Sequence, residues 1–428
     1  MRGAAPHLVA ASLRERFRPE PRQCVPARMQ PMERGGAVEE GARTVRVLGA
    51  PAPEAEVRAP IRIPKILLVG AGGALGRALL EELLRETTAD VVLAGPARRP
   101  LRHALRAAGP SRELRLSCLE LDPWNSEQVT RSLLGVRLAI CAAGPAHAFP
   151  TALAQECVRL GVDYLDLADD RAFVSRVRSL GAGAGAALAT GWGASPALSA
   201  ALVHAGCADL DAIDSIQVTL APGLEAFRSW ERAAALLHAL THPFKIPRKD
   251  LWSTIAGWTE PDEFHFPAPL GTVRGRLIDA PELELFGELF ATRRVEVRLA
   301  PPSAPIARAL GAIAWRARRA SGGEPVGRRG PARALLAVAA AAGGTAAGGV
   351  GVRVAGRYGR RPLTKVISLV APDRGERLAV FAASILAARL MSAAPSPRGV
   401  LRHDTWIAPD ELRAACRDRG LQLSIEER

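Results

Sequence analysis

The sequence predicts an α/β protein, in which a doubly wound parallel sheet is followed by a second, mixed α+β domain. From residue 65 to about residue 200, short continuous apolar runs alternate with helical segments, which is typical of parallel strands buried on both faces. From about residue 210, apolar and polar residues alternate instead, as in strands with one exposed face. Apolar residues make up 48% of the 428, which is enough to bury a core in each part.

The first part contains six predicted strands. Its opening run, residues 66–69, ends in a glycine, and the helix that follows carries leucines at helical spacing between residues 75 and 84. The later strands follow one another at the pace of βαβ units, so we expect them to lie parallel in one sheet. They are residues 91–95, 114–121, 138–143, 164–167 and 186–191, with a helix at 150–160.

The second part is predicted to hold antiparallel strands at residues 213–220, 293–299, 350–354 and 366–370. Helices are expected after it, at 377–390 and 409–419. The N-terminal stretch is rich in Pro, Arg, Ala and Glu without periodicity, so it is predicted to be disordered. The expected divisions are a disordered extension (1–60), a doubly wound α/β domain (61–200), a mixed α+β domain (201–375) and C-terminal helices (376–428).

Charge and cysteine content narrow the function classes. The net charge is +14, but residues 301–372 contribute +11 of it, which argues against a uniformly basic nucleic-acid-binding protein. The six cysteines are scattered without a Cys-x-x-Cys pair, so we expect no metal site and a cytoplasmic protein with reduced thiols. Residues 334–352 lack charge but are mostly Ala and Gly, which favours a buried helix followed by a loop over a membrane span.

The basic segment 301–372 leaves three interpretations open. Its arginines can form a solvated surface, attract an anionic substrate, or contact anionic lipid. The sequence does not decide among them.

A glycine-rich loop joins the first strand to the first helix. Residues 70–76 read Gly-Ala-Gly-Gly-Ala-Leu-Gly; Leu75 breaks the strict Gly-x-Gly-x-x-Gly spacing, although Gly76 follows at once. Glycine lets the chain turn tightly and approach a pyrophosphate, which backbone N–H groups and the helix N-terminus then hold. In this strand–loop–helix context we predict a dinucleotide site formed by Gly70, Gly72, Gly73, Ala74, Leu75 and Gly76.

The end of the second strand favours NADP over NAD. No acid stands there to bind a ribose 2′-hydroxyl, whereas Arg98 and Arg99 follow directly and suit a 2′-phosphate. A solvated arginine pair is the alternative, since the chain is rich in arginine. Asp122, after the third strand, is either an adenine contact or a helix cap. After the fourth strand, small residues leave room for the nicotinamide ribose, namely Ala142, Ala143, Gly144 and Pro145.

Together these motifs resemble the saccharopine dehydrogenase-like family of NADP-binding oxidoreductases over about residues 63–428. The resemblance rests on residues 70–77, 141–145, 156–166, with the run Gly-Val-Asp-Tyr-Leu-Asp, 190–196 and 351–356. It implies a Rossmann domain, an inserted α+β domain for substrate and dimerisation, and a C-terminal helix that packs on the Rossmann core. A homodimer is therefore expected. Pro96 departs from relatives, which often carry Arg at this position, so recognition of the phosphate would depend on Arg98 or Arg99.

Three residues are predicted to be catalytic. The Tyr-x-x-x-Lys pair of short-chain dehydrogenases is absent, so the proton must come from other groups or from water. His147 follows the fourth strand, where ligands sit in such sheets; a surface loop histidine is the alternative. Tyr164 and Asp166 share one face of the fifth strand, and Asp166 would bind a substrate amine or water, or else hold a neighbouring loop.

The predicted function is an NADP-dependent oxidoreductase that transfers a hydride to or from an imine, carbonyl or activated alkene. The substrate is expected to be a small molecule, and the basic segment would suit an anionic one. The alternative is a non-catalytic NADP-binding scaffold or redox sensor, and a peripheral membrane protein is a weaker third hypothesis.

Overall fold

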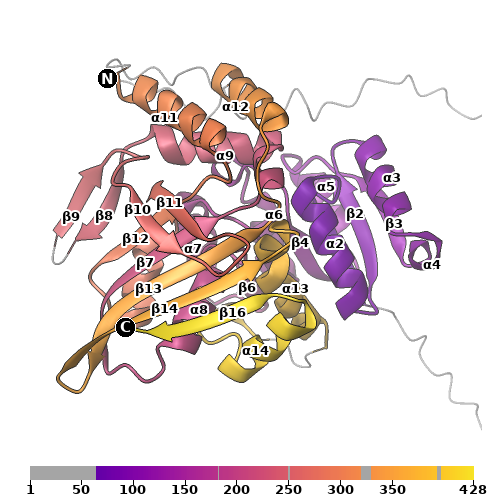
Figure 1. Cartoon of the computed structure of the whole chain (residues 1–428). Helices are drawn as coiled ribbons and strands as arrows, with labels where there is room; N and C mark the ends of the chain where they lie inside the picture. The colour runs from indigo at the N-terminus through magenta and orange to yellow at the C-terminus, as the bar shows by residue number, and fades with distance from the viewer. Residues whose placement is uncertain (1–63, 182, 249–250, 320–328, 393–396) are drawn as a thin grey trace, which may run out of the picture.

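The computed structural model describes residues 64–181, 183–248, 251–319, 329–392 and 397–428. The predicted disordered extension, residues 1–60, lies outside them. Two seven-stranded sheets form the described part of the molecule, and helices pack around both of them (Figure 1).

The first sheet has the strand order β3-β2-β1-β4-β5-β6-β15 and is parallel throughout. The order reverses between β1 and β4, and a ligand crevice lies at such a reversal, beyond the carboxyl ends of the strands. This arrangement confirms the predicted doubly wound sheet. The strands are β1 (Lys65–Val69), β2 (Asp90–Gly95), β3 (Leu116–Glu120), β4 (Val136–Cys141), β5 (Asp163–Asp166), β6 (Ala187–Ala189) and β15 (Gly399–Val400).

Helices connect these strands and bury their apolar sides against the sheet. In the first of them Leu79, Leu80 and Leu83 are buried, as the leucine spacing predicted. The helical elements of this part are α2 (Ala74–Glu86), α3 (Arg98–Ala107), α4 (Pro110–Glu113), α5 (Ser126–Ser132), η1 (Ala146–Ala148), α6 (Ala152–Leu160), α7 (Arg171–Ser179) and α8 (Ala197–Gly206).

The second sheet has the order β10-β11-β12-β7-β13-β14-β16. Its strands are β7 (Ala212–Ala221), β10 (Asp262–His265), β11 (Thr272–Leu277), β12 (Val295–Leu299), β13 (Gly348–Tyr358), β14 (Arg361–Ala371) and β16 (Gln422–Glu427). A separate hairpin is formed by β8 (Phe244–Arg248) and β9 (Leu251–Ile255). The sheet is mixed, as predicted, and the last strand β16 was not expected from the sequence.

One strand of this sheet differs from the prediction. The segment 293–299 was expected to be half-exposed and antiparallel. β12 does pair antiparallel with β11, but it pairs parallel with β7 and is buried along its whole length. Its polar residues Glu296 and Arg298 are buried and form an ion pair of 2.8 Å. Alternating polarity therefore reflected a buried charge pair, because paired charges can replace apolar side chains inside a protein.

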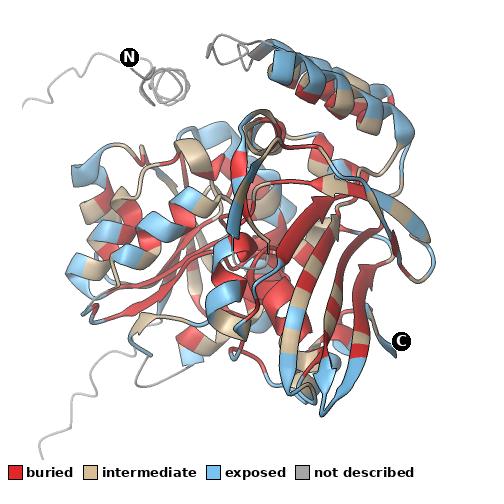
Figure 2. Ribbon diagram, turned by 90° about the vertical axis from the view of Figure 1, so that its left-hand side faces the viewer, coloured by how far each residue is buried: buried red, intermediate tan, exposed pale blue. Residues whose placement is uncertain are grey.

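The helices of the second part are η2 (Leu224–Phe227), α9 (Trp230–Thr241), α10 (Glu282–Phe290), α11 (Ala304–Arg319), α12 (Arg329–Ala341) and α14 (Pro409–Asp418). α9, α11 and α12 pack side by side. The run 334–352 begins in α12 and continues as a loop over residues 342–347, as predicted, before β13 begins at Gly348. None of the described helices is both long and apolar enough to span a bilayer. Burial is concentrated in the two sheets, and the exposed residues lie on the outer sides of the helices (Figure 2).

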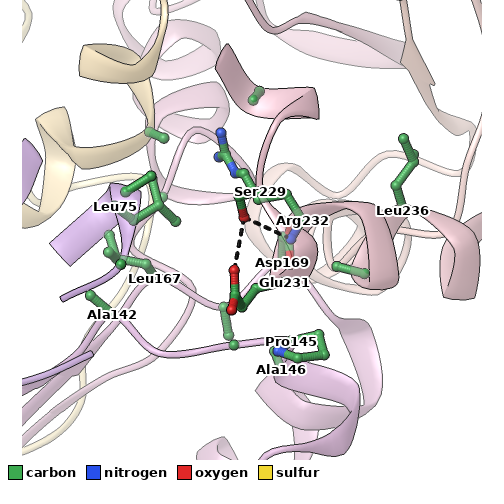
Figure 3. Close-up of a pocket in the computed structure, with 18 of the residues that line it drawn as sticks. Leu75, Ala142, Pro145, Ala146, Leu167, Asp169, Ser229, Glu231, Arg232 and Leu236 are labelled. Carbon is green, nitrogen blue, oxygen red and sulfur yellow. Dashed lines mark hydrogen bonds between the residues drawn. The ribbon is translucent and has the colours of Figure 1, made fainter. Parts of the chain in front are cut away.

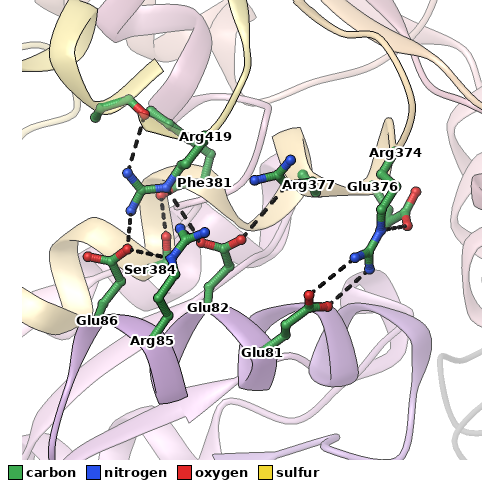
Figure 4. Close-up of polar contacts among 11 residues, drawn as sticks. Glu81, Glu82, Arg85, Glu86, Arg374, Glu376, Arg377, Phe381, Ser384 and Arg419 are labelled. Atoms are coloured by element: carbon green, nitrogen blue, oxygen red, sulfur yellow. Dashed lines mark hydrogen bonds and ion pairs between the residues drawn. The ribbon is translucent and has the colours of Figure 1, made fainter. Parts of the chain in front are cut away.

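The chain returns to the first sheet after completing most of the second. Helix α13 (Glu376–Ser392) packs on α2, and ion pairs join the two regions (Figure 4). Arg374 binds Glu81 through both of its terminal nitrogens, at 3.2 and 3.1 Å. From beyond α14, the buried Arg419 lies 3.5 Å from Glu82 and 2.8 Å from Glu86. Ion pairs with the C-terminal region therefore fix the position of α2, the helix that follows the glycine loop.

Candidate functional site

A cavity of about 550 Å³ lies between the two parts of the molecule, within the size range of cofactor and small-molecule sites. One wall consists of the glycine loop and the chain that follows β2, β4 and β5. The opposite wall is formed mainly by η2, α9 and the loop after β11 (Figure 3). The cavity therefore opens at the carboxyl edge of the parallel sheet and extends to the second sheet's domain.

The glycine loop is shaped by contacts that exclude side chains. Gly70 has φ +85°, and a Cβ atom there would lie 2.6 Å from the Ala143 nitrogen. A Cβ atom on Gly76 would collide with the Gly70 carbonyl oxygen. Gly73 is the N-cap of α2 and provides no side-chain cap, so the helix N-terminus stays open to an anion. This cradle fits a dinucleotide pyrophosphate, which needs close backbone approach and N–H donors.

The residues that the sequence predicts to border the nicotinamide ribose lie in the cavity. Ala142, Ala143, Gly144 and Pro145 all line the cavity, beside the glycine loop. These small residues leave the space beyond β4 open toward the second domain.

The two arginines after β2 lie at the surface and outside the cavity lining. Arg98 forms a 3.0 Å ion pair with Glu120 at the end of β3, whereas no such pair is recorded for Arg99 among the described residues. The lining next to them is made by Pro96 and Ala97. Arg99 is therefore better placed than Arg98 to change its contacts when a phosphate arrives.

Asp122 is engaged in local structure. Its Oδ1 accepts the Trp124 N–H at 3.0 Å, while its own N–H donates to the Gln128 side chain. Its neighbours Leu121 and Pro123 line the cavity, but Asp122 does not. The N-cap of α5 is Asn125, whose side chain accepts the Gln128 N–H at 3.1 Å, so Asp122 is not the helix cap. It holds the turn before the helix instead, and its role as an adenine contact stays a prediction.

His147 lies in the cavity, on the short helix η1. Its ring stacks on that of His238, from α9 of the second domain, with centroids 4.2 Å apart and planes inclined by 10°. The His238 Nε2 atom lies 3.8 Å from the Asp170 carboxylate. The structure thus brings the predicted histidine together with a second histidine and an acid that come from distant segments.

Tyr164 and Asp166 lie beneath the cavity and outside its lining. The Asp166 Oδ1 atom accepts N–H groups from Ala168 at 2.9 Å and from Gly191 at 2.8 Å. Burial raises the pKa of Asp166, and burial together with the Asp166 charge raises that of Tyr164. These contacts suit a residue that fixes the ends of β5 and β6, so the catalytic role predicted for the pair stays a prediction.

Several charged residues that line the cavity belong to no sequence motif and were not predicted as site residues. Asp170 is the N-cap of α7, and its Oδ1 atom accepts the Phe173 N–H at 2.8 Å. Arg171 reaches across the cavity to Asp279, where the two side chains lie 3.1 Å apart. Burial raises the pKa of Asp279 to about 6. The other charged residues of the lining are Asp169, Glu231, Arg232 and Glu376.

Comparisons with known proteins agree with this site. Residues 66–190 match the family model of the saccharopine dehydrogenase NADP binding domain. No curated protein sequence matches the chain. Among solved structures, the fold is similar to apo saccharopine dehydrogenase (L-Glu forming) from Saccharomyces cerevisiae, with 11% identity, a TM-score of 0.59, and coverage of 85% of this chain and 100% of that one.

A second solved structure is an engineered D-amino acid dehydrogenase bound to NADP+. It has 14% identity, a TM-score of 0.41, and coverage of 82% of this chain and 96% of that one. A TM-score this low adds nothing to the assignment, which rests on the family model and on the first similarity in fold. The resemblance predicted from the sequence is confirmed, and so is NADP as the cofactor class. Residues 66–190 therefore form an NADP-binding domain of the saccharopine dehydrogenase type, in a chain whose fold is similar to that of saccharopine dehydrogenase.

Proposed function

We propose that this protein transfers a hydride between NADP and a small-molecule imine, carbonyl or activated alkene held in the cavity between its two domains. The observation that supports this most is the continuity of the cavity. A single space extends from the glycine loop to α9, so a dinucleotide on the first domain would place its reactive end against side chains of the second.

The cofactor, when bound, supplies or accepts the hydride, and the protein supplies orientation and the accompanying proton. The N–H groups of Gly70 and Gly73 donate to the Ala94 and Gly70 carbonyl oxygens and shape the loop. The N–H groups of Gly72, Ala74 and Leu75 would hold the pyrophosphate, and Ala142 to Pro145 would border the nicotinamide ribose. Phe149, Phe227, Trp230 and Leu236 give the rest of the cavity an apolar character, which would exclude water from the reacting atoms.

Two groups in the cavity are suited to exchange the proton. His147 has an imidazole, a group that can donate or accept a proton in catalysis. Asp279 has a carboxyl group whose pKa is raised to about 6, so it holds and releases a proton under physiological conditions. Both lie in the lining of one cavity, His147 on the first domain and Asp279 on the second.

Titration of the purified full-length protein with NADPH and with NADH, followed by fluorescence, tests the cofactor part of the proposal. We expect saturable binding, tighter for NADPH. Failure of both to bind at millimolar concentration would contradict the proposal. Oxidation of bound NADPH is then assayed with aldehydes, cyclic imines and enones. Tight binding without turnover on any of these classes would instead favour the non-catalytic scaffold.

A further inference from the structure

Arg232 is placed where an arginine is electrostatically costly. It stands in the first turn of α9, a helix of 12 residues, and the N-terminus of a helix carries a partial positive charge that repels a cation. Its side chain is half-buried and belongs to the cavity lining, beside Ser229 and Glu231 (Figure 3). The surrounding protein lowers the pKa of Arg232, the direction expected for a cation withdrawn from bulk water.

The guanidinium of Arg232 makes no hydrogen bond or ion pair with any residue that the structure describes. Only its backbone N–H is engaged, as a donor to the Ser229 hydroxyl at 3.2 Å. Asp169 and Glu376 attract it electrostatically, but neither is recorded at ion-pair distance. Other arginines nearby differ in this respect: Arg171 pairs with Asp279, and Arg228 pairs with Glu225 at 2.5 Å.

The opposite wall of the cavity also favours a negative charge. The open N-terminus of α2 lies there, behind Gly73 and Leu75, both of which line the cavity. An oxyanion between the two walls would meet backbone N–H groups on one side and a guanidinium on the other. Arginine binds carboxylates and phosphates in a planar, two-point geometry.

We propose that Arg232 is an oxyanion-binding residue, which reaches from the second domain into the cavity to bind a phosphate or carboxylate group. The inference rests on the proposed function only in taking this cavity as the site of cofactor and substrate. The oxyanion has two sources with the same chemistry, the pyrophosphate of the dinucleotide and an acidic group of the substrate. Binding either one would draw α9 toward the first domain.

The test uses the full-length protein and three variants, Arg232→Gln, Arg232→Lys and the matched control Arg228→Gln. Arg228 lies four residues earlier and outside the cavity lining. One arm measures the equilibrium dissociation constant of NADPH by fluorescence. The other measures succinate binding to the NADPH-saturated protein by calorimetry. Circular dichroism and the melting temperature report whether each variant folds, and the Lys variant retains the charge if the Gln variant does not fold.

Loss of a charge-assisted hydrogen-bond pair is expected to weaken binding about tenfold or more in one arm. Arg232→Lys should lose less, and Arg228→Gln should match the unmodified protein. A change in the NADPH arm assigns the pyrophosphate as the ligand, and a change in the succinate arm alone assigns the substrate. Equal affinities of the Gln variant and the unmodified protein in both arms would overturn the inference and leave the proposed function intact.

A third titration separates the two proposals. If the unmodified protein does not bind NADPH, inorganic pyrophosphate is titrated instead. Pyrophosphate binding that is lost in Arg232→Gln would support the inference although the proposed function fails. Absence of binding to either probe would overturn both.

Discussion

The two walls of the cavity are built from different kinds of groups. The cradle in the first domain's wall consists of glycines, alanines and backbone, and its shape depends on the absence of side chains at positions such as Gly70 and Gly76, although the same wall also carries His147, Asp170 and Arg171 after β4 and β5. The wall on the second domain presents titratable and charged side chains, among them His238, Arg232 and Asp279. The difference suggests a division of labour, in which the cradle fixes a cofactor of constant structure, while the second wall, together with His147, selects and protonates a particular substrate.

The largest effect is expected from filling the backbone cradle. In Gly70→Ala, the new Cβ would lie 2.6 Å from the Ala143 nitrogen, at a φ of +85° that a side chain disfavours. NADPH binding should weaken by about 100-fold or more, as expected when binding geometry is displaced by about an ångström. Gly135→Ala is the control, because φ there is +72° with nothing within 4 Å of the added atom. Similar NADPH affinities for the two variants would show that the loop does not hold the cofactor.

The second prediction concerns the ion pairs that join α2 to the C-terminal region. Arg419→Met removes one of three arginines that pair with the buried Glu82 and leaves Arg85 and Arg377, so it should lower the free energy of unfolding by about 2 kcal/mol. Arg374→Met breaks the exposed pair with Glu81 and should cost less than about 1 kcal/mol. Denaturant unfolding of both variants measures the difference, and equal losses would refute this view of the joint between α2 and the C-terminal region.

Substitution of His147 should change the rate of catalysis without changing the affinity for NADPH. His147→Ala removes a general acid or base and should lower kcat by about 100-fold, while the dissociation constant of NADPH stays unchanged. His265→Ala serves as the control, because His265 is exposed on β10, outside the cavity. A loss of NADPH affinity with kcat preserved would place His147 on the cofactor side of the division.

The pKa of the Asp279 carboxyl group predicts how the rate of the reaction depends on pH. Its carboxyl group is mostly protonated below the pKa of about 6 and ionised above it. If it donates the proton during NADPH oxidation, the rate should fall tenfold for each pH unit above about 6. In the reverse direction, where a base is needed, the rate should rise through the same range. In Asp279→Asn the change of rate near pH 6 should disappear. If the pH–rate profile still shows that change in the variant, another group is responsible for it.

The smallest effect concerns cofactor choice. Arg99→Ala should lower the preference for NADPH over NADH by about tenfold, because a charge-assisted bond to the 2′-phosphate is lost. Arg98→Ala should have a weaker effect, since Arg98 is already paired with Glu120. Competitive titrations with both dinucleotides measure the ratio. A larger loss in Arg98→Ala would mean that this ion pair yields to the phosphate.

The contrast between the walls also explains what could be read from the sequence. The glycine loop and the residues after β4 act through contiguous backbone, so their pattern predicted the first sheet, its cofactor wall and the position of His147 in the cavity. The charged residues of the second wall come from α9 and from the loop after β11, which no motif connects. Only the fold brings Arg232 and Asp279 to the same cavity.

Two features of the second sheet, the pairing of β12 and the presence of β16, were not predicted from the sequence for physical reasons. The parallel pairing of β12 was missed because its alternating charges resemble an exposed strand, whereas Glu296 and Arg298 neutralise each other inside the protein. Strand β16 was missed because its six residues, Gln422–Glu427, include only two apolar ones. It pairs with β14 at the edge of the sheet, and such a position demands little burial.

The most direct measurement is a crystal structure of the protein grown with NADPH. The account predicts electron density for the pyrophosphate at the open N-terminus of α2, within hydrogen-bonding distance of backbone N–H groups between Gly72 and Leu75, with the nicotinamide ring pointing toward α9. A dinucleotide bound elsewhere, or a cradle closed by rearranged side chains in the presence of saturating NADPH, would contradict it.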